Sequence, residues 1–333
     1  AILAINGDYY GSRERGYVLR NGTLYQDVAL KTAADRTTGS IDDLIIRKDG
    51  SFAIINEAQT PMSALLADGA QQVLAFGPAM LENGALSAER MMHTAAAAAA
   101  LVERARVEGC ETLRLFATSA TRDAKNGAEF CELVEALCGA PLEILSGEEE
   151  ARLSFLGATG GAAGTGVLDI GGGSTELALL DGGHLKTISL QLGSSRLLQV
   201  FPDLTAENAL RALDEAEAIL RAGVETLGVR ETPRKFMSVG GNGYRLAVAD
   251  RLRLGLDPEG AEGWQLTLDA VRGWTDRLCR MTVPERAQVP GLPASRAEVV
   301  AHGAVILYAA MRTLNLPAIT ATKRTNLDGA LLE

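Results

Sequence analysis

The sequence has few cysteines and histidines, and their spacing argues against common metal and disulfide frameworks. Its four cysteines form no CxxC pair, so neither a zinc site of that type nor a disulfide scaffold is expected. The three histidines, His93, His184 and His302, are isolated and lack ligand spacing. With no signal peptide recognisable at the start, this cysteine usage predicts a reducing, cytoplasmic environment.

Long hydrophobic runs and an excess of basic residues are also missing. The alanine-rich run from Ala95 to Leu101 is much shorter than the ~20 apolar residues of a membrane-spanning helix, so no membrane partner is expected. The 42 acidic residues outnumber 32 basic ones, giving a net charge of −10, which argues against a nucleic acid duplex as partner. A polyanionic substrate is still compatible, because a basic cleft or bound cations can override the global charge.

The 333 residues are enough for two domains, and the texture of the chain changes near residue 85. Residues 1–82 hold most of the tyrosines and many turn signals between short strand-like runs. From Ser87 onward, helical periods alternate with short apolar runs, which predicts an α/β fold. This part includes predicted helices over residues 206–227, 266–281 and 296–314.

The most informative stretch is GVLDIGGGSTE, residues 166–176. A short apolar run leads to Asp169, and the three glycines Gly171, Gly172 and Gly173 precede Ser174. Glycines after a strand let backbone N–H groups turn toward a phosphate, because no Cβ blocks the approach. Asp169 and Glu176 on either side are suited to hold a divalent cation beside that phosphate, although a turn Asp and an edge-strand Glu are the simpler alternatives.

A second acidic feature is the helix start SGEEEAR, where Glu148, Glu149 and Glu150 follow Ser146. Acids at a helix N-terminus stabilise its dipole by ~0.3–1 kcal/mol each, and one or two of these three need do no more. A third acid at the same end allows one carboxylate to polarise a water molecule for in-line attack on a phosphoryl group.

Three further segments are candidate phosphate contacts. Arg122 follows a strand-like run and either grips a phosphate or pairs with a neighbouring acid. Gly193 and Ser194 form a turn and helix start, or a phosphate contact. Gly240 and Gly241 after a strand are suited to cradle a nucleotide or polyphosphate, although a glycine pair is a weak signal.

The segment from about Asn83 to Glu333 resembles the exopolyphosphatase/guanosine pentaphosphate phosphatase (Ppx/GppA) family. Several ordered motifs carry this resemblance, which makes it more specific than a single pattern. They lie at residues 117–127, 144–154, 167–177, 191–197 and 296–307.

The resemblance implies a two-lobed actin/hexokinase-like (ASKHA) fold that removes terminal phosphates from polyphosphate or from the guanosine polyphosphate pppGpp, with Mg²⁺ or Mn²⁺ as cofactor. By the family pattern, Glu150 is the general base for water, and Asp169 and Glu176 bind the metal. Arg122 and residues 171–174 bind phosphate. A homodimer is compatible with this interpretation, and the oligomeric state stays open.

The beginning of the chain departs from that family, because its first phosphate loop and the following apolar strand are not recognisable. Residues 1–82 instead resemble the start of a phosphodiester glycosidase domain, through AINGDYYG at 4–11, RGYVLRNG at 15–22, DGSF at 49–52 and FGPA at 76–79. We therefore expect a chimera with an incomplete first lobe, divided into residues 1–82, 83–140 and 141–333. Two alternatives stay open: a glycosidase fragment acting on sugar phosphodiesters, and a non-catalytic polyphosphate- or nucleotide-binding protein.

Overall fold

A computed structural model describes residues 84–229, 233 and 235–333, and the earlier segments 2–4, 16–20, 23–28, 42–47, 52–56, 62–67 and 70–75. The chain divides into two compact units, residues 1–144 and 145–333, each considered by itself below. The division at residues 82 and 140 stays a prediction. No helix of the described residues is both long enough and apolar enough to cross a membrane.

The first unit contains a three-stranded parallel sheet. Its central strand β7 (Arg114–Ala117) pairs with β8 (Leu142–Ile144) on one side. Its other neighbour is β1 (Ile2–Ala4), with Ile2 opposite Arg114. The start of the chain therefore contributes an edge strand to this sheet. The expected absence of a first phosphate loop concerns residues 5–15, which lie outside the described residues.

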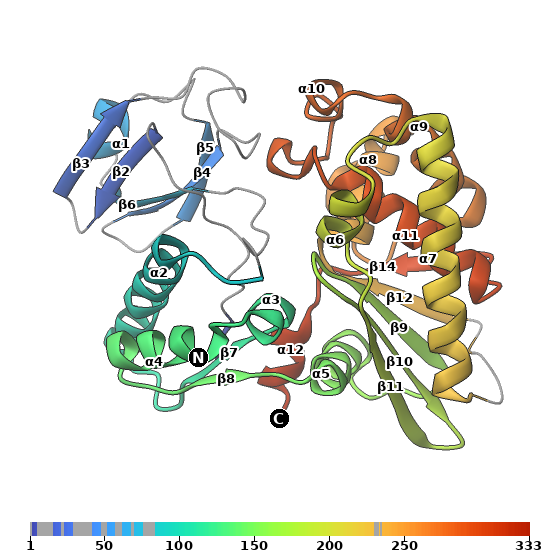
Figure 1. Cartoon of the computed structure of the whole chain (residues 1–333), viewed down its shortest axis with the longest axis horizontal. Coiled ribbons are helices and arrows are strands. Elements are labelled where there is room, and N and C mark those ends of the chain that lie inside the picture. Colours follow the sequence, from blue (N-terminus) through green and yellow to red (C-terminus); the bar gives the residue numbers. More distant parts are fainter. Residues whose placement is uncertain are drawn as a thin grey trace. The chain divides into compact units, whose positions relative to one another are not determined.

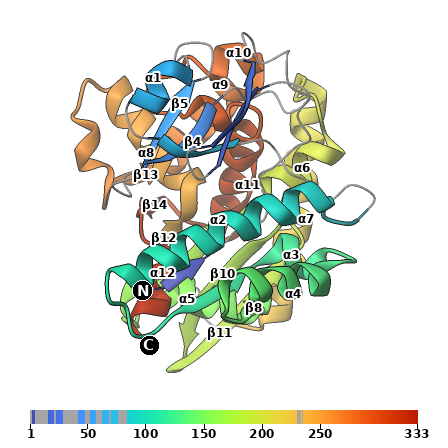
Figure 2. The ribbon, with the colours of Figure 1, turned by 90° about the vertical axis from the view of Figure 1, so that its left-hand side faces the viewer.

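Three helices contact this sheet. α2 packs against α4 around the buried side chains of Phe130 and Val134 (Figure 2). Gly139 ends α4 in the left-handed conformation with φ 61°, which glycine adopts without a Cβ penalty. The helices are α2 (Ala88–Val107), α3 (Ser119–Asp123) and α4 (Gly127–Cys138).

The remaining described strands of the first unit form two smaller sheets. One is an antiparallel hairpin, and the other is a three-stranded antiparallel sheet with a short helix in its connection. These elements are β2 (Gly16–Arg20), β3 (Thr23–Val28), β4 (Asp42–Arg47), β5 (Phe52–Asn56), α1 (Met62–Ala67) and β6 (Ala70–Ala75).

The second unit is built on a six-stranded mixed sheet in the order β11-β10-β9-β12-β14-β13 (Figure 1). The first three strands along the chain form an antiparallel meander, and β12 then returns parallel to β9. The strands are β9 (Thr165–Ile170), β10 (Thr175–Asp181), β11 (His184–Leu190), β12 (Lys235–Val239), β13 (Gln265–Thr267) and β14 (Ala318–Ala321).

Helices cover both faces of this sheet. α5 contacts one face and carries α12 on its side, whereas α7 and α11 lie over the other face (Figure 1). The helices are α5 (Gly147–Thr159), α6 (Ser194–Val200), α7 (Ala206–Leu227), α8 (Gly240–Arg253), α9 (Leu268–Arg280), α10 (Val283–Arg286), α11 (Val300–Thr313) and α12 (Asn326–Leu331).

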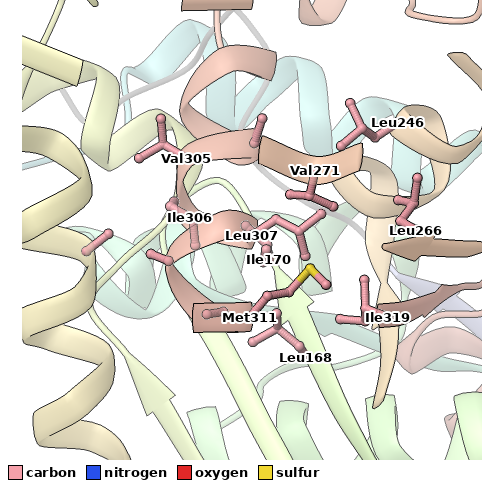
Figure 3. Packing of buried hydrophobic residues seen from close by; sticks show 14 of the residues in the cluster. Leu168, Ile170, Leu246, Leu266, Val271, Val305, Ile306, Leu307, Met311 and Ile319 are labelled. Atoms are coloured by element: carbon pink, nitrogen blue, oxygen red, sulfur yellow. The ribbon is translucent and has the colours of Figure 1, made fainter. Parts of the chain in front are cut away.

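Alternation along the strands decides which side chains enter which layer. Leu168 and Ile170 of β9 join the large core, beside Met311 of α11 (Figure 3). Val167 points to the opposite face and packs with α5. Because successive side chains of a strand face opposite ways, Asp169 shares the α5 face with Val167. The site described below therefore lies on the α5 side of the sheet end.

Most predicted elements are present, but two predicted helices begin later than expected. Residues 265–267 pair with β14 as β13, so the helix predicted from residue 266 begins at Leu268, where Thr267 caps it. The helix predicted from residue 296 begins at Val300, because residues 294–296 form a 3₁₀ turn. Short sheet pairings and tight turns are decided by tertiary contacts that the periodicity of the sequence does not contain.

A glycine contact holds α5 against α12. A Cβ on Gly157 would lie 2.2 Å from the carbonyl oxygen of Thr325, and one on Gly329 would lie 1.9 Å from that of Leu153. Neither position tolerates a side chain unless the two helix backbones separate. The last helix is therefore fixed in place on α5.

We predict that Gly157→Ala lowers the free energy of unfolding by about 1–3 kcal/mol, because the added methyl overpacks this contact. Gly273→Ala is the matched control, since Gly273 lies within α9 and nothing is within 4 Å of its Cβ position. That change is expected to stabilise the protein by about 0.5–1 kcal/mol through helix propensity. Urea unfolding measures both, and equal stabilisation of the two variants would contradict the contact.

Candidate active site

Two acids meet across the hairpin formed by β9 and β10. Asp169 and Glu176 are directly opposite each other in the antiparallel register. The turn between them is closed by a 2.9 Å hydrogen bond from the N–H of Gly171 to the carbonyl oxygen of Ser174. Opposed residues of an antiparallel pair share a face, so both carboxylates project to the α5 side.

Asp169 is held by a serine from α5. The hydroxyl of Ser154 donates a 2.7 Å hydrogen bond to Oδ2 of Asp169. Burial raises the pKa of the Asp169 carboxyl, and the bond from Ser154 lowers it in part. A carboxylate fixed in this way at the end of a strand is positioned for a ligand above the glycine turn.

Glu176 lies in a more acidic environment. Its side chain is 1% exposed, and the hydroxyl of Ser189 on β11 donates a 2.7 Å hydrogen bond to its Oε1. Burial raises the pKa of Glu176 well above its usual range, and the carboxylates of Glu150 and Asp169 raise it further. Three carboxylates therefore interact at one place on the second unit.

The three acids at the start of α5 differ in exposure and in partners. Glu148 is exposed. Glu149 forms two 2.8 Å hydrogen bonds with the guanidinium of Arg152 on the surface. Glu150 is buried, and it is the one of the three that interacts with Glu176. The Glu149–Arg152 pair is thus a local helix contact, and Glu150 faces the acidic cluster.

The start of α5 is pressed against β11. Ser146 caps the helix by accepting a 3.1 Å hydrogen bond from the N–H of Glu149. A Cβ on Gly147 would lie 2.2 Å from Cβ of Ser189, the residue that binds Glu176. The absent side chain of Gly147 therefore allows the approach that brings Glu150 to Glu176.

These acids suit a divalent cation that is completed by other ligands. Among the described residues, no three acidic, cysteine or histidine side chains are disposed to hold a metal ion by themselves. Mg²⁺ is usually bound by one or two carboxylates together with waters and substrate phosphates. A cation would also offset the mutual repulsion that raises the pKa of Glu176. The oxygen donors of Asp169 and Glu176 therefore fit such an ion.

The glycine turn is anchored by the N-terminus of α6. The N–H of Ser194 donates to the carbonyl oxygen of Gly171 at 3.0 Å, and the N–H of Ser195 donates to that of Gly172 at 2.9 Å. Nε of Arg196 donates to the carbonyl oxygen of Gly173 at 2.8 Å. The free N–H groups that begin a helix thus satisfy the carbonyl groups of the loop.

This anchoring determines which groups of the loop are available to a ligand. The carbonyl oxygens of Gly171, Gly172 and Gly173 all face α6. No described group accepts a hydrogen bond from the N–H of Gly172 or Gly173. Unpaired consecutive N–H groups in a turn form an anion-binding concavity.

Gly193 and Ser194 have a supporting position in this arrangement. A Cβ on Gly193 would lie 2.2 Å from the carbonyl oxygen of Gly172, so only glycine allows α6 to approach the loop. Both the N–H and the hydroxyl of Ser194 donate to the carbonyl oxygen of Gly171. Their direct contact with phosphate stays a prediction.

Gly240 and Gly241 lie beside the acids, at the start of α8. Gly240 has φ +81°, and a Cβ there would lie 2.9 Å from Oδ1 of Asp169. A Cβ on Gly241 would lie 2.7 Å from Cζ of Arg296, so this guanidinium packs on the glycine pair. Asn242 fixes the turn by donating a 2.7 Å hydrogen bond to the carbonyl oxygen of Ile170.

Arg122 does not belong to the second unit, which contains this cluster of acids. It lies in the last turn of α3, in the first unit. Its role as a phosphate ligand stays a prediction.

Sequence reasoning missed three residues that contact the site: Ser154, Ser189 and Arg296. Ser154 follows Glu150 by four positions, so both lie on one face of the predicted helix. Ser189 is opposite Glu176 when the hairpin is counted back from its turn at residues 182–183. Arg296 begins the family motif at residues 296–307, but its contact with Gly241 depends on the tertiary packing of the 294–296 turn on α8.

The comparisons with known proteins agree with this geometry. The model of the Ppx/GppA phosphatase family matches residues 54–333. The chain belongs to this family. It is 33% identical over 240 residues to exopolyphosphatase 1 of Mycobacterium tuberculosis, with 67% of each chain covered. As a member of the Ppx/GppA family, the chain is an exopolyphosphatase-like hydrolase that acts on phosphoanhydride bonds.

Solved structures show the fold. An exopolyphosphatase-like protein, 27% identical, superposes with a TM-score of 0.66 over 76% of this chain and 86% of its own. The Ppx/GppA family member of Aquifex aeolicus, 23% identical, gives 0.64 over 87% of this chain and 92% of its own. An exopolyphosphatase from Cytophaga hutchinsonii, 17% identical, gives 0.67 over 88% and 94%. The expected α/β actin-like ASKHA fold is thereby confirmed.

The family match corrects one boundary. It begins at residue 54, whereas the sequence motifs predicted that the likeness begins near residue 83. Short motifs mark only the well-patterned parts of a family, so the earlier part was missed. Nothing in these comparisons supports a glycosidase segment.

We predict that Gly240→Ala displaces Asp169 and lowers phosphatase activity more than its effect on folding explains. Gly255→Ala is the matched control, because Gly255 has φ +71° with nothing within 4 Å of its Cβ position. Both variants carry a backbone cost of about 1–2 kcal/mol in unfolding free energy. Activity and urea unfolding are measured together, and equal activity in the two variants would show that Gly240 has no special relation to Asp169.

We also predict that Glu150→Gln lowers the pKa of Glu176, because it removes the carboxylate that raises this pKa most after burial. A ¹³C NMR titration of the glutamate carboxyl groups measures the shift. Glu149→Gln, which changes the surface pair with Arg152, leaves the pKa of Glu176 unchanged. An unshifted Glu176 in Glu150→Gln would mean that the two carboxylates do not interact.

Proposed function

We propose that the protein removes the terminal phosphate from inorganic polyphosphate or pppGpp, with Glu150 as the base that activates water. The observation that carries this proposal is the selective burial of Glu150, next to Glu176, while its neighbours Glu148 and Glu149 remain at the surface. The names of the curated relatives, which are exopolyphosphatases, support the substrate class.

Each part of the cluster has a role in this mechanism. The N–H groups of Gly172 and Gly173, with that of neighbouring Ser174, would hold the oxygens of the phosphate under attack, while Gly171 closes the turn. Gly240, Gly241 and Arg296 would hold the adjacent phosphate of the polyphosphate or pppGpp substrate. Arg122 would bind a substrate phosphate, and Gly193 and Ser194 would keep the loop in shape.

Glu150 would accept the proton of the attacking water. A general base must lie within hydrogen-bond reach of that water, and the start of α5 holds Glu150 rigidly through the Ser146 cap and the Gly147 contact. Ser154 and Ser189 keep the carboxylates of Asp169 and Glu176 oriented. Fixing reactant and base in this geometry supplies a large part of the rate in phosphoryl transfer.

Asp169 and Glu176 would hold Mg²⁺ or Mn²⁺. When bound, such an ion neutralises charge on the phosphate oxygens. The chain is acidic overall. Without a bound cation, the three carboxylates of the cluster would repel an approaching polyanion.

The decisive experiment is phosphate release from long-chain polyphosphate with Mg²⁺. Glu150→Gln is expected to lower kcat by about 10²–10⁴, the usual contribution of a general base, with little change in KM. Glu149→Gln is the matched control, one position earlier in the same helix turn, and should retain wild-type activity. Equal activity of wild type and Glu150→Gln would overturn the assignment of the base.

The same assay separates the remaining candidates. Comparing kcat/KM for polyphosphate and for pppGpp identifies the preferred substrate. Hydrolysis of a sugar phosphodiester that survives Glu150→Gln would instead indicate a glycosidase. Thermal stabilisation by polyphosphate without turnover of either substrate would indicate a binding protein.

A further inference from the structure

The second unit contains a cavity of about 760 Å³ that no residue of the candidate active site lines. It is bounded by the segment before α7, the first turns of α7, the end of α9, α10 and the middle of α11. Its volume is within the range of about 300–1,000 Å³ typical of small-molecule sites. No step of the proposed phosphatase reaction uses it.

The walls of this cavity are largely apolar. Leu213, Val305 and Tyr308 contribute to them from α7 and α11. Leu210 also lines the cavity, and it is 64% exposed. Burial raises the pKa of Cys279 to about 11, so this lining thiol stays neutral. These walls suit the hydrocarbon part of a ligand.

A single buried cation lines the cavity. Arg286 is 6% exposed, and its Nε donates a 2.8 Å hydrogen bond to the carbonyl oxygen of Leu278. Its Nη1 reaches the carbonyl oxygens of Ala297 and Glu298 at 3.5 Å. Among the described residues, no carboxylate forms an ion pair with Arg286, and none accepts a hydrogen bond from its Nη2.

A buried guanidinium without a counter-ion is costly, and burial accordingly lowers the pKa of Arg286. The N-terminus of α7, a helix of 22 residues, adds positive character, because Thr205 and Ala206 also line the cavity. Asp203 and Asp276 lie on the lining as well, but both are exposed and screened by solvent. The buried end of the cavity therefore favours an anion.

We propose that this cavity is a second ligand site, which binds a small monocarboxylate with an apolar body. The carboxylate accepts hydrogen bonds from the guanidinium of Arg286, and the alkyl or aryl part fills the walls between α7, α9 and α11. A neutral ligand of the same shape leaves Arg286 without a counter-ion, and inorganic phosphate leaves the apolar walls in contact with water. Both therefore bind more weakly than the amphipathic acid.

The test uses the full chain and decanoate as probe, below its micelle concentration, in isothermal titration calorimetry. The expected result is saturable binding of one decanoate per chain, with decan-1-ol and inorganic phosphate each at least about tenfold weaker, because a charge-assisted hydrogen bond or the apolar contact is lost. Arg286→Met is expected to abolish the preference for decanoate over decan-1-ol.

A second variant keeps the test valid if Arg286→Met folds poorly. Ala209→Trp fills the cavity from α7, whereas Ala222→Trp adds the same side chain to an exposed position of the same helix outside the lining. Ala209→Trp should remove decanoate binding and Ala222→Trp should leave it unchanged. Absence of saturable binding, equal binding of decanoate and decan-1-ol, or equal binding by the two tryptophan variants would overturn the proposal.

Discussion

The register of the β9–β10 hairpin is the constraint on which the candidate site depends. It sets Asp169 opposite Glu176 and places both on the side of the sheet that α5 covers. A shift of β10 by one residue would turn Glu176 toward the large apolar core, where Leu177 and Leu179 now lie. The hydrophobic pattern of the strands therefore fixes the positions of these carboxylates, because only one register buries the apolar side chains in the core.

Close backbone packing brings three helices to these acids. Glycines at three close approaches bring α5, α6 and α8 close to the β9–β11 meander, where side chains would hold them apart; they are Gly147, Gly193 and Gly240. The N–H groups at the start of α6 donate to the carbonyl groups of the glycine turn, and no described group accepts from the N–H of Gly172 or Gly173. In the proposed function, these backbone groups would bind the anion and the carboxylates would contribute the chemistry.

Much of this arrangement could be predicted from the sequence, and the physical reasons are visible in particular residues. The strand, the glycines and the acids at 166–176 are contiguous, so local patterning was sufficient to find them. The helix pattern alone did not distinguish Glu149 from Glu150, because the difference depends on which side of α5 meets the sheet; the family resemblance was what favoured Glu150. The contact of Arg296 with Gly241 was missed because it depends on the tertiary packing of the 294–296 turn. The beginning of the chain was harder still, since β1 pairs with a strand more than a hundred residues away.

The crowding of carboxylates around Glu176 also has a consequence for the evolution of stability. A carboxyl whose pKa is raised on folding binds its proton more tightly in the native state, so the free energy of unfolding falls as the pH rises from the unfolded value through the folded one. At neutral pH the cation-free fold is therefore less stable than an isosteric amide at this position would make it. The carboxylate that is proposed to hold the cation is therefore also a source of instability when no cation is bound.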